Sequence, residues 1–273
     1  MKRRVFTAVP LAALVAYIVL QSRPWPFVLA VVLTVEICLF EFFAISRHTG
    51  LKGLPILGYI AGAALCGAQV AVLRGADGAI LVVLLLIFVV VPVLALVNSG
   101  GLKDYLGTVA TTLFGIIYVG FGLSWLVRMR FGDPTTGRLL TILLLLMIWA
   151  DDIFAYAVGR ALGKRALVAR ISPKKTIEGS VAGLAGTILV AWGFMRFFWR
   201  SAGLETTLLL AVPVAVAGQV GDLVESTLKR GAGMKDSSNL LPGHGGMLDR
   251  VDSLLLGAPV FWLAWELNQL WHR

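Results

Sequence analysis

Long apolar runs follow one another along nearly the whole chain, separated by short polar or basic breaks. Most runs hold at least about 18 residues, enough for a helix to cross a hydrocarbon core about 30 Å thick. Strands of a membrane barrel would alternate polar and apolar residues, and these runs do not. The pattern predicts nine transmembrane helices, at residues 5–22, 25–45, 53–73, 78–98, 105–127, 138–159, 177–199, 205–226 and 253–270.

Composition supports the same fold class. Of the 273 residues, 58% are hydrophobic and 14% are charged, whereas a soluble domain carries about 25% charged residues. Little chain is left for a soluble domain. We therefore expect an all-α, polytopic integral membrane protein with a bundle of about nine helices. Cys38 and Cys66 lie inside apolar runs without a metal-binding spacing, so we expect both to be buried packing residues.

Basic residues are unevenly distributed among the breaks. With the N-terminus in the cytoplasm, 16 of the 24 lysines and arginines fall on the cytoplasmic side, as the positive-inside rule requires. Two long polar loops, 160–176 and 227–252, then face the cytoplasm too. The net charge of +9 suits anionic lipid headgroups or other phosphate groups. No basic run lies outside the membrane pattern, so we expect no nucleic-acid binding.

The second loop is bracketed by two pairs of acids. Asp222 and Glu225 end one predicted span, Asp249 and Asp252 begin the next, and a spacing of three places each pair on one helix face. Carboxylates at membrane depth are costly unless they are paired or bind a metal. Hard oxygen ligands of this kind suit Mg²⁺. Side chains that suit phosphate oxygens lie between the acids, at Lys229, Arg230, Lys235 and Arg250.

The run through this loop resembles the signature of phosphatidate cytidylyltransferases, also called CDP-diacylglycerol synthases. It reads Ser226-x-Leu228-Lys229-Arg230-x₄-Lys235-Asp236-x-Ser238-x₂-Leu241-Pro242-x-His244-Gly245-Gly246-Met247-x-Asp249-Arg250-Val251-Asp252. A second segment, Ser172-Pro173-Lys174-Lys175-Thr176, and the stretch Asp152-x-x-Ala155-Tyr156 resemble the same family. The resemblance is specific from about residue 149 to residue 252.

The resemblance implies transfer of a cytidylyl group from CTP to phosphatidate, which gives CDP-diacylglycerol and pyrophosphate. It further implies a site with Mg²⁺, which we expect to hold two ions. The expected metal ligands are Asp222 and Asp249, with Asp152, Glu225 and Asp252 as secondary candidates. The expected catalytic residues are Asp222, Lys229, Arg230, Lys235, Asp236, Asp249 and Arg250. The expected CTP-binding residues are Ser172, Lys174, Lys175, Thr176, His244, Gly245 and Gly246.

This assignment divides the chain by role. Residues 1–100 form a scaffold of transmembrane helices, and residues 101–273 form the catalytic domain that carries both loops. We expect the protein in a bacterial cytoplasmic membrane, with its N-terminus and active-site loops in the cytoplasm and with membrane lipids around it. Glu36, Glu41 and Glu266 are further acids within spans, and nothing in the sequence converges on them, so we interpret them as structural.

Two alternatives stay open at this point. The chain could use CTP with another lipid phosphate or a polyprenyl phosphate, because the surfaces that choose the acceptor cannot be identified in the sequence. A polytopic ion-coupled transporter would carry repeats with polar residues near the midplane, and neither is found here. Small-residue faces at Gly58-x-x-x-Gly62 and Gly179-x-x-x-Gly183 fit helix packing within the chain or a homodimer equally well.

Overall fold

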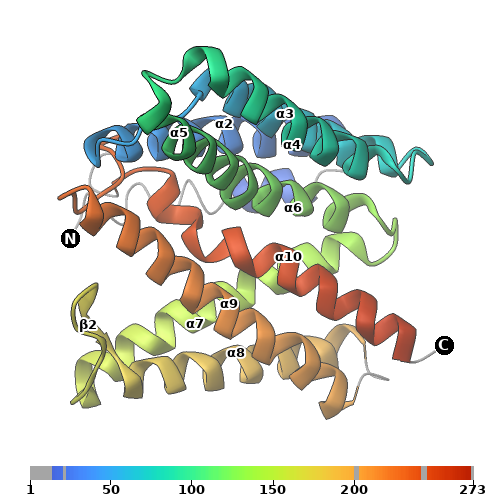
Figure 1. Ribbon diagram of the computed structural model, residues 1–273. Coiled ribbons are helices and arrows are strands. Elements are labelled where there is room, and N and C mark those ends of the chain that lie inside the picture. The colour runs from blue at the N-terminus through green and yellow to red at the C-terminus, as the bar shows by residue number, and fades with distance from the viewer. Residues whose placement is uncertain (1–13, 21–22, 200–202, 241–244, 272–273) are drawn as a thin grey trace. The chain divides into compact units, whose positions relative to one another are not determined.

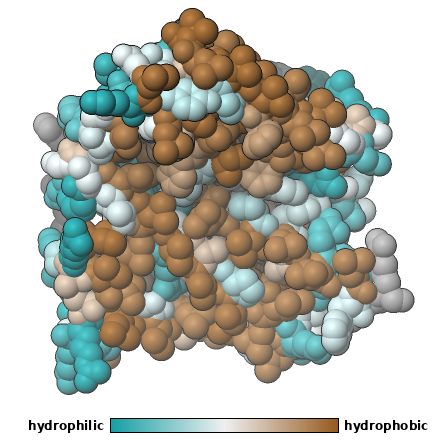
Figure 2. Space-filling model, in the orientation of Figure 1, coloured by the Kyte–Doolittle hydropathy of each residue, from teal (hydrophilic) through white to brown (hydrophobic). Residues whose placement is uncertain are grey.

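The structure, a computed structural model, describes residues 14–20, 23–199, 203–240 and 245–271. Within them, seven helical segments are long and apolar enough to cross a membrane. The protein is therefore an integral membrane helix bundle, as the apolar runs predict. On the face shown in Figure 2, apolar side chains predominate. Most of the predicted span at 5–22 lies outside the described residues.

The chain divides into two compact units, and each is described by itself. The first comprises residues 1–138 and 228–251, and the second comprises residues 139–227 and 252–273. The predicted division at residue 100 concerns the roles of two segments and stays a prediction. The first unit holds a run of helices in sequence order (Figure 1): α2 (Pro24–His48), α3 (Pro55–Val72), α4 (Ala79–Asn98), α5 (Leu102–Gly115), the π-helical segment η1 (Ile116–Phe121) and α6 (Gly122–Phe131).

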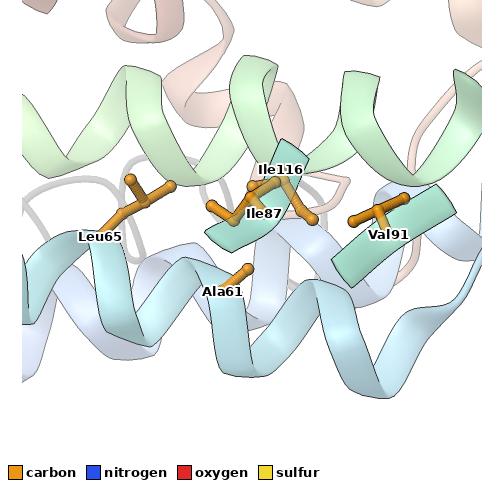
Figure 3. Packing of buried hydrophobic residues seen from close by; sticks show 5 residues of the cluster. All are labelled: Ala61, Leu65, Ile87, Val91 and Ile116. Atoms are coloured by element: carbon orange, nitrogen blue, oxygen red, sulfur yellow. The ribbon is translucent and has the colours of Figure 1, made fainter. Parts of the chain in front are cut away.

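Buried aliphatic residues hold α3, α4 and η1 together. Figure 3 shows five of them, Ala61 and Leu65 on α3, Ile87 and Val91 on α4, and Ile116 on η1. None is more than 6% exposed, so van der Waals packing between these side chains holds the three helices together, as is usual between helices in a membrane.

The small-residue face of α3 packs against α2. A Cβ on Gly62 would lie 2.7 Å from Leu39 Cδ1 and 2.8 Å from Val35 Cγ1. Only a residue without a side chain lets the two helices approach this closely. Cys38 and Cys66 are both buried in these two helices, as predicted.

The second unit carries most of α7 (Gly137–Leu162), the strands β1 (Ala166–Val168) and β2 (Ser172–Thr176), and α8 (Ile177–Phe198). It also carries most of α9 (Leu204–Gly231) and α10 (Leu248–Trp271), both of which run through the boundary between the units. The strands pair antiparallel, with Ala166 opposite Thr176 and Val168 opposite Ser172. This hairpin lies beside the C-terminal end of α7 and the start of α8 (Figure 1), within the segment 160–176 that the sequence predicts as a long polar loop.

Glycines also set the spacing of α8 against α7. A Cβ on Gly179 would lie 2.7 Å from the carbonyl oxygen of Ala155, and one on Gly183 would lie 2.6 Å from Asp151 Oδ1. The second small-residue face therefore packs within the chain, as the first does. Neither face supports a homodimer, which stays a prediction.

Candidate functional site

The second unit contains a cavity of about 560 Å³ that combines acidic and basic side chains. We call it the charged cavity. Its walls come from α7, β1, β2, α8, α9 and α10. It is lined by Asp151, Asp152, Ala155, Tyr156, Gly159, Arg160, Leu167, Lys174, Lys175, Thr176, Gly179, Ser180, Gln219, Asp222 and Ser253. Five predicted site residues from three distant segments thus surround one space: Asp152, Lys174, Lys175, Thr176 and Asp222.

An ion pair joins the two predicted motifs inside the charged cavity. Lys175 Nζ on β2 contacts Asp222 Oδ2 on α9, and the side chains are 30% and 26% exposed. An ion pair this accessible to water and salt is worth little for stability. Because a ligand can enter and exchange with either partner, the pair suits binding of an anion to the lysine and of a cation to the aspartate.

Asp222 also belongs to a group of three acids, which we call the carboxylate cluster. Ligand oxygens of Asp222, Glu225 and Asp252 all lie within 4.8 Å of one another. The sequence predicts all three as candidate metal ligands and the first two on one face of a helix, and the structure brings Asp252 of α10 next to them. Three carboxylates this close repel one another unless protons or cations offset their charge.

A glycine allows α10 to bring Asp252 into the cluster. Gly221 on α9 faces the α10 backbone, and a Cβ there would lie 2.6 Å from the carbonyl oxygen of Asp252. Gly218, one turn earlier, faces Ser253, and a Cβ there would lie 3.6 Å from the Ser253 Cβ atom, an ordinary contact. The absence of a side chain at Gly221 lets two carboxylate-bearing helices meet at backbone distance.

Sequence reasoning missed the polar network on the wall of the charged cavity. Gln219 Nε2 donates hydrogen bonds to Asp151 Oδ1 at 2.8 Å and to the carbonyl oxygen of Ser180 at 3.0 Å, and the Ser180 hydroxyl donates to Gln219 Oε1. The network links α7, α8 and α9 one turn before Asp222. In a single sequence, nothing marks Gln219 or Ser180 as part of a site, and Asp151 stands next to Asp152, which matches the family motif better.

The entry to α8 is structured by its own side chains. Thr176 is the N-cap residue, and its hydroxyl oxygen accepts a hydrogen bond from the Gly179 amide at 3.1 Å. Glu178 Oε2 accepts from the amides of Lys164 at 3.1 Å and Arg165 at 3.4 Å, which ties the hairpin to the helix. Ser172, a predicted CTP-binding residue, lies on β2 and is not among the residues that line the charged cavity.

The remaining predicted residues lie in the first unit, around Asp249. Lys229 Nζ pairs with Asp249 Oδ1 at 2.5 Å, and both side chains are nearly buried. Asp249 Oδ2 accepts from the Ser237 amide at 2.9 Å, the Ser237 hydroxyl at 2.9 Å and the Gly246 amide at 2.7 Å. Gly245 adopts φ +77°, a conformation that favours glycine, beside the same carboxylate. Asp249 therefore orders its own loop, and its predicted role as a metal ligand stays a prediction.

The other predicted catalytic residues lie near Asp249 in the sequence, in the first unit, and their side chains are exposed. They are Arg230, Lys235, Asp236 and Arg250. Arg230 Nη1 donates to the carbonyl oxygen of Met234 at 3.1 Å, which fixes the turn after α9. His244 lies outside the described residues.

The structure also brings an unexpected residue to this loop. Glu41 on α2 is 1% exposed, and its carboxylate accepts hydrogen bonds from Ser237, Ser238, Met247 and Leu248. The sequence shows Glu41 only as one acid in an apolar run, and its partners lie 196 to 207 residues away.

The carboxylate cluster has the donor set that a divalent metal needs. All its ligand atoms are carboxylate oxygens, the ligands that Mg²⁺ prefers over nitrogen or sulfur. Their mutual distances of at most 4.8 Å allow one ion to contact all three side chains. Among the described residues, the cluster is the one group of three or more metal-ligating side chains close enough to share an ion. The residues present therefore fit Mg²⁺.

Comparisons with known proteins agree with this chemistry. A sequence model of the Cytidylyltransferase family matches residues 2–268. A Bacillus subtilis protein named phosphatidate cytidylyltransferase is 34% identical over 270 residues, which cover 95% of each chain.

Two further relatives bear the same name and match a shorter part. The Synechocystis protein is 40% identical over 181 residues, which cover 56% of this chain and 60% of the relative. The Staphylococcus saprophyticus protein is 40% identical over 151 residues, which cover 55% of this chain and 56% of the relative. The chain thus spans less than two thirds of the length of these two proteins.

Proposed function

Because the chain belongs to the cytidylyltransferase family, we propose that it transfers a cytidylyl group from CTP to phosphatidate, forming CDP-diacylglycerol and pyrophosphate. The observation that carries the proposal is the charged cavity, where lysines of the hairpin meet acids of α7 and α9. A nucleoside triphosphate is a polyanion whose phosphates need cationic partners. The positively charged side chains of the cavity suit the phosphates of a nucleoside triphosphate, and the negatively charged side chains suit the metal ions that accompany those phosphates.

The reaction is a displacement at phosphorus. A phosphate oxygen of phosphatidate attacks the α-phosphorus of CTP and forms a new P–O–P bridge. The bond from the α-phosphorus to the oxygen that bridges to the β-phosphorus breaks, and pyrophosphate leaves with that electron pair. Such a reaction needs alignment and charge neutralisation rather than a protein nucleophile.

Residues of the charged cavity have defined roles in this proposal. Lys174 and Lys175 bind phosphate oxygens of the substrates, and Arg160 extends the basic wall from α7. Arg160 Nη1 donates to the Tyr156 hydroxyl at 3.0 Å, which orients the guanidinium group. When a substrate phosphate binds Lys175, the lysine no longer neutralises Asp222, and that carboxylate becomes available to a metal ion.

The carboxylate cluster would hold Mg²⁺. Asp222, Glu225 and Asp252 supply its protein ligands, with Asp152 at the cavity wall as a further candidate. When bound, the ion supplies neutralisation of the charge that develops on the phosphate oxygens. Asp249, with Lys229, lies in the other unit and stays a predicted member of the same machinery.

The proposed location follows from the substrate and the topology. Phosphatidate is a membrane lipid, and CTP is a cytoplasmic nucleotide. We therefore place the protein in the cytoplasmic membrane of a bacterium, with its N-terminus and the segments 160–176 and 227–252 facing the cytoplasm. The excess of basic residues on that side supports this orientation.

The direct test is an assay of the purified protein in detergent micelles with CTP, phosphatidate and Mg²⁺. We expect pyrophosphate and CDP-diacylglycerol to form in equal amounts, and neither to form without the lipid. Steady hydrolysis of CTP in lipid-free micelles would contradict the proposal. Polyprenyl phosphate in place of phosphatidate tests the acceptor, and faster turnover with it would overturn the proposed substrate. ATP in place of CTP should reduce the rate sharply.

A further inference from the structure

Glu41 joins two parts of the chain around the connection from α9 to α10: residues 237–238, which follow α9, and residues 247–248, where α10 begins. In the first part, the Ser238 hydroxyl donates to Glu41 Oε1 at 2.5 Å and the Ser237 hydroxyl donates to Oε2 at 2.9 Å. In the second part, the Met247 amide donates to Oε1 at 3.0 Å and the Leu248 amide donates to Oε2 at 2.7 Å. Each carboxylate oxygen thus receives one hydroxyl and one amide, one from each part.

The amide contacts lie at the N-terminus of α10. Leu248 is the first residue of that helix, and the first amides of a helix have no acceptor within it. The helix dipole favours a negative charge at this position. Glu41, supplied by α2 from the far end of the sequence, therefore caps the helix that carries Asp249.

Ser237 extends the connection from Glu41 to Asp249. Its hydroxyl oxygen lies 2.9 Å from Glu41 Oε2 and 2.9 Å from Asp249 Oδ2. A hydroxyl has one proton, so the two carboxylates share a single donor. Packing around this point leaves no spare room, because a Cβ on Gly246 would lie 2.5 Å from Glu41 Oε1. Glu41 and Asp249 are thus connected through one intervening residue.

We propose that Glu41 is a positioning residue for the cytidylyl transfer, which holds residues 237–238 and 247–248 in the arrangement that presents Asp249 to substrate. Without it, only the hydrogen bonds of Asp249 to Ser237 and Gly246 hold the two parts together, and a smaller fraction of molecules presents Asp249 and its neighbours correctly. Part of the binding free energy of the substrate is then used to order these residues. The apparent affinity for the substrate therefore falls in proportion to the fraction of molecules that are already ordered. This inference rests on the proposed function for its kinetic part only.

Glu41→Gln tests the proposal because it preserves size while it removes the charge. The amide has one oxygen and one NH₂ group, so about half of the four donors face another donor. We expect the KM for CTP or for phosphatidate to rise by about 10- to 100-fold, while kcat changes by less than about fivefold. A purely structural role would reduce the amount of folded enzyme, and would lower kcat with both KM values unchanged.

Matched variants keep the test decisive. Glu36→Gln makes the same change earlier on α2. The Oε1 atom of Glu36 accepts no hydrogen bond from the described residues, so we expect the KM values for CTP and for phosphatidate to stay within about twofold of wild type. Ser238→Ala removes one donor and leaves the Glu41 charge, so it should raise the same KM by a smaller factor. If Glu41→Gln fails to fold, Ser238→Ala carries the kinetic test.

Hydrogen exchange gives a readout that needs no substrate. In wild-type protein in micelles, the amides of Met247 and Leu248 should be protected, and in Glu41→Gln their exchange should be at least about 10-fold faster, with the melting temperature shifted by only a few degrees. Unchanged protection, or unchanged KM values for both substrates, would overturn the role of Glu41. If wild-type protein fails to turn over CTP but the exchange result holds, the proposed function fails and the anchoring role of Glu41 stands.

Discussion

Replacement of Gly221 by alanine tests whether the geometry of the carboxylate cluster matters for activity. The added Cβ would lie 2.6 Å from the carbonyl oxygen of Asp252, whereas ordinary contacts begin at 3.4 Å. The neighbour is backbone, so it cannot rotate away, and α9 and α10 must separate by about 0.8 Å. Asp252 moves with α10 away from Asp222 and Glu225.

The expected consequences for rate and stability differ in size. A misplacement approaching 1 Å in a phosphoryl-transfer site costs about 10²-fold in kcat/KM. Overpacking costs about 1–3 kcal/mol, and alanine recovers about 1 kcal/mol over glycine inside a helix. We therefore expect the free energy of unfolding to fall by no more than about 2 kcal/mol, which leaves the protein folded.

Kinetics and thermal unfolding of purified protein in micelles measure both effects. Gly193→Ala is the matched control, because Gly193 lies inside α8 in the same unit and nothing lies within 4 Å of its Cβ position. We expect the control to retain wild-type activity. Activity of Gly221→Ala within threefold of wild type would refute the reasoning, because the cluster would then tolerate a displacement that the contact makes unavoidable.

Three further predictions address the charges of the site. Lys175→Met, which removes the ion pair to the carboxylate cluster, should lower kcat/KM for CTP by about 10²-fold in steady-state assays. The control Lys164→Met, at an exposed residue outside the lining of the charged cavity, should change kcat/KM less than twofold. Equal losses in the two variants would contradict the role of Lys175 in binding substrate phosphate. Asp249→Asn should lower kcat by about 10³-fold, and Glu266→Gln in the same helix should have a much smaller effect on the same assay. Mg²⁺ at 100 times its Kd should stabilise the wild-type protein by about 2.7 kcal/mol in thermal unfolding, and an undiminished Mg²⁺ effect in Asp252→Asn would exclude that residue as a ligand.

Local patterns in the sequence predicted much of the fold and part of the site. Apolar length predicted α8 closely, since it begins at Ile177 and ends at Phe198 where the pattern predicted 177–199. The predicted span at 253–270 is the helix α10, which is not among the seven helical segments that are long and apolar enough to cross a membrane. Acids three residues apart predicted the shared face of Asp222 and Glu225, because helix geometry fixes it. The strands β1 and β2 escaped prediction, because three and five residues with a proline and two lysines carry little strand propensity.

Contacts between distant segments could not be predicted in the same way. The role of Glu41 depends on donors more than 190 residues later in the chain, and its own surroundings in the sequence are uniformly apolar. The approach of Asp252 to Asp222 depends on Gly221, whose importance appears only when the neighbouring backbone is seen. A single sequence shows the chemical groups of a site, whereas their partners follow from tertiary packing.

The central claim is that the carboxylate cluster acts as one unit in cytidylyl transfer. Its most direct test is the rate of CDP-diacylglycerol formation by Asp222→Asn, by Asp252→Asn and by the double variant, at saturating CTP, phosphatidate and Mg²⁺. Ligands of a shared site lose function together, so each single variant should be about 10³-fold slower than wild type and the double variant little slower than either. An Asp222→Asn enzyme that is folded and within tenfold of the wild-type rate would contradict the claim.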